Sequence, residues 1–152
     1  MRLLIAAVGR IKAGPLADLQ SEYVKRLGGS IAIKEVEERR ALPAEQRKAR
    51  EGELLLAVLP EDAVVVALDE RGKTLASTGF AERMQRWQTD GVKTLAFVIG
   101  GADGLAQPVV QRAGLSLSLG AMTWPHLLAR ILLLEQLYRA QQILNGNPYH
   151  RE

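Results

Sequence analysis

Two stretches of this chain are apolar at nearly every position and rich in β-branched residues. Ala63–Leu68 reads Ala-Val-Val-Val-Ala-Leu, and Thr94–Ile99 reads Thr-Leu-Ala-Phe-Val-Ile. A strand that is apolar at successive positions, rather than at alternate ones, is buried on both faces, which is typical of a parallel sheet covered by helices on each side. These two runs constrain the fold more than any other feature of the sequence.

Strand and helix patterns alternate along the rest of the chain. Three further strand candidates are Arg2–Val8, Ile31–Val36 and, more weakly, Leu115–Leu119. Five other segments have helical patterns. The first is an apolar stripe over residues 16–27 that Gly28-Gly29 would end, and the second begins at Pro43 and ends before Pro60. The third is marked by Phe80, Met84 and Trp87, a short fourth follows Pro108, and the last runs from His126 to Leu144. This alternation predicts an α/β fold, a mostly parallel sheet with helices on both faces, in a single domain spanning residues 1–152.

Composition narrows the class of protein. Hydrophobic residues make up 47% of the chain and charged residues 24%, which excludes a mainly disordered chain. Three charged residues interrupt the most apolar stretch, Leu127–Leu144, and the apolar run at the N-terminus is too short for a signal peptide, so we expect a cytoplasmic protein with no membrane segment. There is no cysteine, and the two histidines have no acidic pair at ligand spacing, so we expect no metal site.

Charge permits a nucleic-acid partner without requiring one. The net charge is +3, and the most basic stretch lies within residues 37–53. Its five Arg and Lys residues are interleaved with five Glu residues, a pattern more typical of a solvated helix face than of a phosphate-binding stripe.

In parallel sheets, ligands bind outside the carboxyl ends of the strands, so three loops are candidates for a binding site. The segment 69–74 contains Gly72-Lys73-Thr74, but Ala67 stands where a phosphate-binding P-loop needs glycine, so we interpret it as a charged surface turn. Gly100, Gly101 and Gly104 follow an apolar strand, which suits either a ligand-binding loop or a plain tight turn. Segment 120–126 has the small and apolar residues of a pocket for a flat ring, although ordinary core packing would give the same composition.

Two other features carry candidate chemistry. The tail residues Tyr149, His150 and Arg151 offer an aromatic ring, an imidazole and a fixed cation, which suits recognition of a nucleobase and a phosphate. A tail merely docked on its own domain is the alternative. Arg130 lies within an otherwise apolar helical pattern, so its guanidinium must either reach solvent or pair with a carboxylate.

Several motifs occur in order and at fitting distances along the chain: Leu68-Asp69, Ile99–Leu105, Met122–His126, Leu137–Ala140 and Asn147–Glu152. With these motifs the chain resembles the ribosomal RNA large-subunit methyltransferase H family, SPOUT-class enzymes that methylate N3 of a pseudouridine in 23S rRNA. The resemblance implies S-adenosylmethionine as cofactor, a C-terminal trefoil knot, and a homodimer in which the partner helps complete the active site. It also implies a ribosomal substrate, and the modest charge favours a folded ribosomal surface over free RNA.

The resemblance also assigns roles to individual residues. The tail residues match those associated with RNA and catalysis: we expect His150 to accept or relay the N3 proton, Arg151 to stabilise the imide anion or a phosphate, and Tyr149 to position the base. Trp124 departs from the smaller aliphatic residue expected at its position. The expected cofactor-binding residues are Leu68, Gly100, Gly101, Gly104, Gly120, Ala121, Met122, Thr123, Trp124 and Pro125.

Two other functions are the alternatives for such a chain. A dinucleotide-dependent dehydrogenase would need a Gly-x-Gly-x-x-Gly turn after the first strand, which Val8–Lys12 does not supply. A non-catalytic ribosome-binding factor would need no cofactor pocket. The helix predicted over His126–Leu144 is apolar nearly all round, so it is either the innermost helix or part of a subunit interface.

Overall fold

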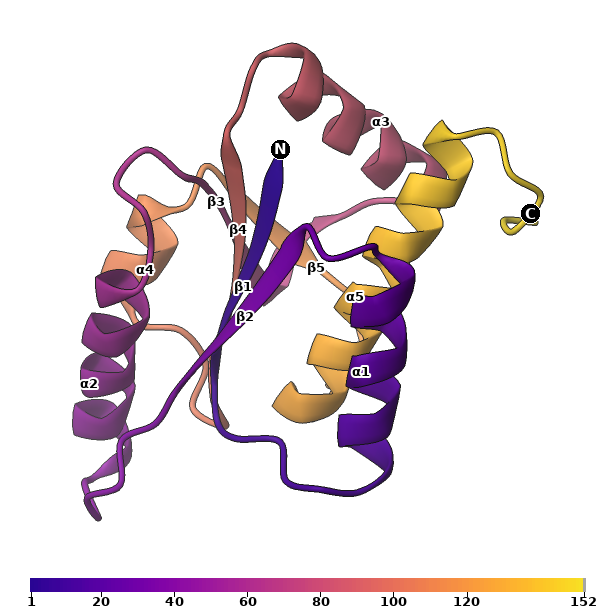
Figure 1. Cartoon of the computed structure of the whole chain (residues 1–152). Coiled ribbons are helices and arrows are strands. Elements are labelled where there is room, and N and C mark those ends of the chain that lie inside the picture. The colour runs from indigo at the N-terminus through magenta and orange to yellow at the C-terminus, as the bar shows by residue number, and fades with distance from the viewer. Residues whose placement is uncertain (152) are drawn as a thin grey trace.

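A computed structural model describes residues 1–151 and shows a five-stranded, all-parallel sheet with helices on both faces (Figure 1). The strands lie in the order β2-β1-β4-β3-β5. Their bounds are β1 Arg2–Val8, β2 Ile31–Val36, β3 Val64–Thr74, β4 Thr94–Ile99 and β5 Leu115–Ser118. The helices are α1 Pro15–Arg26, α2 Ala44–Ala57, α3 Ser77–Thr89, α4 Gln107–Arg112 and α5 His126–Leu144. The predicted α/β architecture is confirmed.

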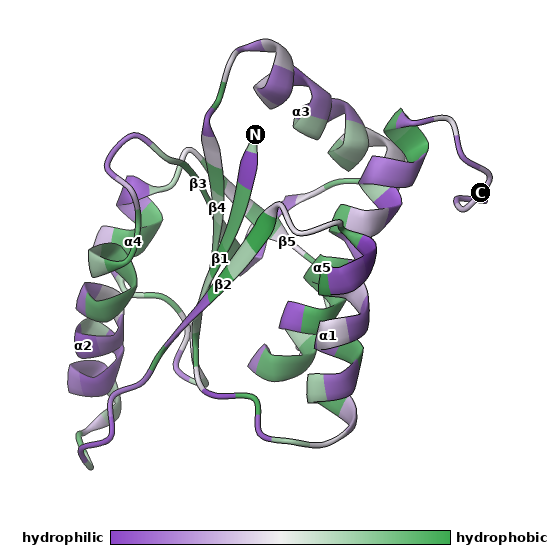
Figure 2. Ribbon diagram, viewed as in Figure 1, coloured by the Kyte–Doolittle hydropathy of each residue, from purple (hydrophilic) through white to green (hydrophobic). Residues whose placement is uncertain are grey.

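The helices divide unevenly between the two faces of the sheet. Figure 1 shows α2 and α4 on one face and α1, α3 and α5 on the other. Because β1, β3 and β4 are covered on both sides, their successive side chains enter two separate cores. Ile5 packs under α3 and α5, whereas its neighbours Leu4 and Ala6 belong to the cluster under α2 and α4. This double burial explains the continuous apolar runs that Figure 2 shows in green along the central strands.

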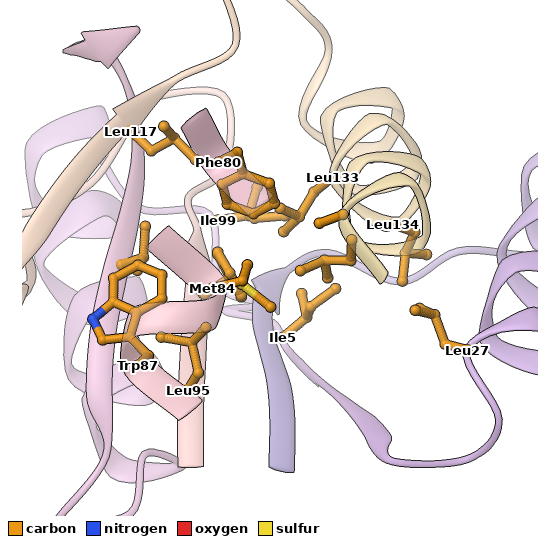
Figure 3. Close-up of a cluster of buried hydrophobic side chains, with 14 of the residues drawn as sticks. Ile5, Leu27, Phe80, Met84, Trp87, Leu95, Ile99, Leu117, Leu133 and Leu134 are labelled. Carbon is orange, nitrogen blue, oxygen red and sulfur yellow. The ribbon is translucent and has the colours of Figure 1, made fainter. Parts of the chain in front are cut away.

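The larger core lies between the sheet and the helices α3 and α5. Figure 3 shows Phe80 and Met84 of α3 on the side of the core toward Leu133 and Leu134 of α5, with Trp87 of α3 beside Leu95. These α3 residues recur at helical spacing, so they form one apolar stripe that the sheet and α5 bury together. Every residue of α5 is buried or half-buried, which makes it the most enclosed helix of the fold.

One local prediction was wrong. Segment 69–74 is not a surface turn, because β3 continues through it to Thr74 and pairs with β5 again at Lys73 and Thr74. The register shifts between Leu68 and Lys73, so the charged residues form a bulge within a paired strand. Gly72 permits the close approach: a Cβ at that position would lie 2.6 Å from the backbone of Ser116.

Arg130 could reach solvent or pair with a carboxylate, and in the structure it pairs with a carboxylate. It is fully buried, and its Nη1 donates to Glu35 Oε2 at 2.6 Å, while Nη2 donates to the carbonyl of Gly9 at 3.1 Å. Glu35 Oε2 also accepts a hydrogen bond from the backbone N–H of Ile11. Arg130 therefore ties α5 to β2 and to the loop that follows β1.

No helix within residues 1–151 has the length and hydropathy needed to cross a bilayer. Across the same residues, no three His, Asp or Glu side chains gather as they would around a metal ion.

Candidate active site

A cleft of about 830 Å³ opens at the carboxyl ends of β3, β4 and β5. Three segments that are distant in sequence form its wall: residues 68–71, 99–105 and 117–126. Nine of the ten predicted cofactor-binding residues line it, namely Leu68, Gly100, Gly101, Gly104, Gly120, Met122, Thr123, Trp124 and Pro125. The tenth, Ala121, is exposed between two of them and does not line the cleft. The structure therefore brings the predicted loops together at one place.

The glycine loop after β4, residues 100–104, adopts a shape that depends on the absence of side chains at its glycines. Gly104 adopts φ +83°, which favours glycine, and its N–H donates to the carbonyl of Gly101 at 3.1 Å. A Cβ on Gly100 would lie 2.8 Å from the backbone of Gly104. The loop is thus folded tightly on itself, and its backbone forms the cleft wall.

Segment 119–125, between β5 and α5, forms the opposite wall. Gly120 adopts φ +118°, and the Ser118 hydroxyl both donates to the Gly120 carbonyl and accepts from its N–H. Thr123 donates to Glu70 of the β3 bulge at 3.2 Å, which ties this wall to the neighbouring one. Met122 is 74% exposed and Trp124 41% exposed, whereas most large apolar side chains of the chain are covered. These two side chains give the cleft an open apolar wall.

His126 lines the cleft where α5 begins. Burial lowers the pKa of its imidazole, and the nearby Arg130 guanidinium lowers that pKa further. A Cβ on Gly9 would lie 3.0 Å from His126 Nε2, so Gly9, at φ +100°, allows the loop after β1 to pack against the ring. The neutral form of His126 is therefore favoured.

The predicted catalytic tail packs against the middle and second half of α5, away from the cleft. Of the residues that the structure describes, none beyond Ala129 lines the cleft. The nineteen residues of α5 rise along its axis by about 27 Å between its ends. Figure 1 shows the C-terminal segment near the end of α5 that is remote from the carboxyl ends of the strands. A single chain therefore does not bring Tyr149, His150 and Arg151 to the cleft.

The tail is docked on α5 instead. The Tyr149 hydroxyl donates to Glu135 at 3.1 Å, and its ring meets Tyr138 edge-on, with ring centroids 4.8 Å apart. Burial, together with the Glu135 charge, raises the pKa of Tyr149. His150 Nδ1 lies 3.0 Å from Nη1 of Arg139. Arg151 is exposed.

Sequence reasoning missed several charged residues of the cleft. Lys48 of α2 lines it, as do Asp69, Glu70, Arg71 and Asp103. Asp103 is held by Arg47, whose Nε and Nη2 lie 2.9 Å from Oδ2. The alternation of opposite charges on α2 concealed Arg47 and Lys48, because it is equally typical of a solvated helix. Asp103 lies within the predicted glycine loop, and its position there was the one available signal.

Comparison with known proteins identifies the family. A family model described as a predicted SPOUT methyltransferase matches residues 1–150. The chain is 58% identical over 151 residues to the ribosomal RNA large subunit methyltransferase H of Paramagnetospirillum magneticum, covering 99% of both chains. The chain belongs to the ribosomal RNA large subunit methyltransferase H family. A second member, from Rhodospirillum centenum, is 56% identical over the same length, again with 99% of both chains covered.

The fold of this methyltransferase H family member also occurs in a solved structure. A probable methylase family protein from Haemophilus influenzae superposes with a TM-score of 0.57 over 99% of this chain and 70% of that chain. The two sequences are only 15% identical, so the likeness concerns the fold.

Proposed function

We propose that this chain is an S-adenosylmethionine-dependent methyltransferase that methylates N3 of a pseudouridine in 23S rRNA, acting on assembled ribosomes. Membership of the methyltransferase H family, with relatives more than half identical over the full chain, supports the reaction. The single structural observation that carries the proposal is the convergence of the glycine loop and segment 119–125 on one cleft at the carboxyl ends of the strands.

The cleft suits the proposed cofactor in size and chemistry. Its volume of about 830 Å³ lies within the range of small-molecule sites, and glycine backbone next to apolar side chains suits an adenine ring and a ribose. When bound, the cofactor supplies a methyl group made electrophilic by its sulfonium. Leu68, the glycines 100, 101 and 104, and residues 120–125 would hold it, with Trp124 offering a flat face at the cleft opening.

The substrate nitrogen needs a group that removes its proton. Pseudouridine N3 carries a hydrogen, and its lone pair forms the new bond to carbon as that hydrogen leaves. In this proposal the proton passes to the imidazole of His150, Arg151 stabilises the charge that develops on the imide or a phosphate, and Tyr149 positions the base. His126 lies in the cleft, and its lowered pKa makes its neutral imidazole a weaker base.

A homodimer would bring the two halves of this site together. The tail contacts Glu135 and Arg139, about 14–20 Å along the axis of α5 from its start at the cleft, so in this proposal it serves the cleft of a second copy. The half-buried Leu127, Leu128 and Leu132 of α5 leave apolar surface for such a contact. Light scattering coupled to size exclusion would show a mass of twice 16.6 kDa.

The proposal includes the trefoil knot of the SPOUT class, although knotted chains are rare. The passage of segment 119–125 beside both the β3 bulge and the glycine loop supports it. Pulling the chain from its two ends tests it directly. A knotted chain stops extending short of the full contour length, which is about 3.5 Å per residue.

The decisive experiment is methyl transfer to ribosomes that lack the modification, followed by mapping of the altered nucleotide. Wild-type enzyme should label one pseudouridine in intact ribosomes and label isolated rRNA poorly. His150→Ala should lower the single-turnover rate at least about a hundredfold, the typical contribution of a general base, and leave cofactor affinity nearly intact. An unchanged rate would remove His150 from this role, and a protein that binds ribosomes without methylating them would refute the enzyme assignment.

Pairing two inactive variants tests the shared site. A tail variant, His150→Ala, and a cleft variant, Gly101→Val, should each be inactive alone. Mixed dimers should regain activity, because one of their two sites combines an intact tail with an intact cleft. Absence of any recovery in mixed dimers of proven composition would contradict the cross-subunit tail.

A further inference from the structure

Glu51 of α2 is a buried carboxyl group that the proposed reaction leaves unused. Its side chain is 7% exposed, and Oε1 is completely buried with no hydrogen bond reaching it from the described residues. A carboxyl in such surroundings is costly to ionise unless a positive charge or hydrogen-bond donors compensate. The arrangement therefore requires an explanation beyond packing.

Glu51 lies directly against the glycine loop that forms the cleft wall. A Cβ on Gly101 would be 3.1 Å from Glu51 Oε2 and 3.3 Å from Oε1, so the absence of a side chain at Gly101 lets the loop backbone and the carboxyl group lie close together. Gly101 itself lines the cleft. No side chain separates this carboxyl group from the loop backbone that faces the proposed cofactor.

Two of the three cations nearest in sequence are engaged elsewhere. Arg47 pairs with Asp103 at 2.9 Å. Arg50 pairs with Glu38 at 3.3 Å and with Glu53 at 2.9 Å. The third, Lys48, lines the cleft, and no ion pair within residues 1–151 joins it to Glu51. Glu51 thus borders the cleft with no direct ion-pair partner when it is ionised.

We propose that Glu51 is the counter-charge for the sulfonium of the methyl donor, acting across the backbone of Gly101. The inference rests on the proposed function and adds a charge-recognition residue to it. A carboxylate behind the cleft wall favours a cationic donor over the neutral thioether product, because attraction between charges is strong where water is excluded. The same charge would help release the product after transfer.

The protonation of Glu51 provides a second test of the proposal. Burial raises the pKa of Glu51, and the negative charge of Asp103 raises it further, whereas Arg47 acts in the opposite direction. Glu38, in the segment between β2 and α2, also raises it. A bound cation favours the ionised carboxyl group, so cofactor binding should release protons.

Binding measurements on the purified full chain test this with a matched control. Glu51→Gln keeps the shape of the side chain and removes its charge. Glu53→Gln makes the same change on the same helix at a side chain that is 68% exposed and paired with Arg50. The probes are S-adenosylmethionine, sinefungin with an amine in place of the sulfonium, S-adenosylhomocysteine with no charge at sulfur, and methylthioadenosine with no amino-acid part.

We expect Glu51→Gln to weaken the binding of S-adenosylmethionine and of sinefungin by about tenfold and to leave the affinity for methylthioadenosine unchanged. Glu53→Gln should change none of these affinities. The affinity for S-adenosylhomocysteine should stay unchanged, because it has no charge at sulfur, and an equal loss for it would overturn the recognition of the sulfonium by Glu51. Calorimetry in buffers of different ionisation enthalpy should show proton release that disappears in Glu51→Gln.

Equal weakening of all four probes, or of none, would overturn the role of Glu51 and leave the methyltransferase assignment standing. Failure of the wild-type chain to bind any of the four would instead refute the proposed function. Circular dichroism of both variants separates a loss of binding from a loss of fold.

Discussion

Replacing Arg130 with methionine tests whether the buried ion pair beneath the cleft holds the fold together. Methionine fills much of the same volume but donates no hydrogen bonds. The substitution leaves Glu35 without its 2.6 Å partner and the Gly9 carbonyl without its donor. Both groups belong to segments that α5 would no longer hold.

The expected cost follows from burial on each side of the pair. Removing one partner of a buried ion pair costs about 3–5 kcal/mol. Arg130 is fully buried, but the Glu35 side chain is 30% exposed, so water can partly resolvate the abandoned carboxylate. We therefore expect a loss of about 3 kcal/mol, at the lower end of that range. At about 2–4 °C per kcal/mol for a domain of this size, the melting temperature should fall by roughly 6–12 °C.

Urea unfolding followed by circular dichroism measures this change. Arg10→Met is the matched control, because Arg10 pairs with Glu37 at 3.1 Å while 61% exposed, and such surface pairs contribute about 0–1 kcal/mol. Adding Glu35→Gln to Arg130→Met should recover part of the loss by removing the stranded charge. A difference below about 1 kcal/mol between wild type and Arg130→Met would refute the reasoning.

The ion pair should also depend on pH. Burial acts to raise the pKa of Glu35, but the hydrogen bonds from Arg130 and from the Ile11 N–H outweigh it, and the pKa lies below the ordinary value of 4.5. The stabilisation is therefore complete above about pH 4.5 and is lost as pH falls through the lowered pKa. The deficit of Arg130→Met should shrink in acid, and a deficit that is constant from pH 7 to pH 3 would contradict this.

Three further substitutions test the cleft and its supports. Gly72→Ala should cost about 1–3 kcal/mol in urea unfolding, because its Cβ meets the Ser116 backbone at 2.6 Å, whereas Gly79→Ala, with no atom within 4 Å, should be neutral or stabilising. Burial and a neighbouring guanidinium lower the pKa of His126, so wild-type stability should decrease as pH drops below 6.5, and His126→Gln should flatten that decrease. Trp124→Leu should reduce cofactor affinity by about tenfold if the indole stacks on the adenine, as measured by calorimetry; equal affinity would show that the ring is not used.

Most of the fold could be predicted from residue patterns because the patterns have direct physical causes. Double burial made Ala63–Leu68 and Thr94–Ile99 apolar throughout, and the stripe of Phe80, Met84 and Trp87 reflects one buried helix face. The continuation of β3 past Leu68 could not be predicted. Its charged residues look like a turn in sequence, and only the return of pairing with β5 at Lys73 makes them part of a strand.

The candidate site also has parts that the sequence predicts and parts that it does not. The glycines of residues 100–104 and the mixture of small and apolar residues in 120–125 are local signals, and parallel topology brings both to the carboxyl edge of the sheet. Glu51 gave no such signal, because its environment depends on how α2 packs against a loop fifty residues away. In sequence it is one of the five glutamates in the charged segment 37–53.

The position of the tail has a consequence for how this small chain can carry out its proposed reaction. Helix α5 begins at the cleft with His126, and Glu135 and Arg139, about 14 and 20 Å further along its axis, hold Tyr149 and His150. The chain leaves α5 at Leu144, about 27 Å along the axis from the cleft, and the six residues from there to His150 span at most about 21 Å, so loop motion does not bring the tail to its own cleft. Two copies related by a two-fold axis would place each tail at the cleft of the other copy. In the proposed function, the length of α5 is thus the physical reason for a dimer.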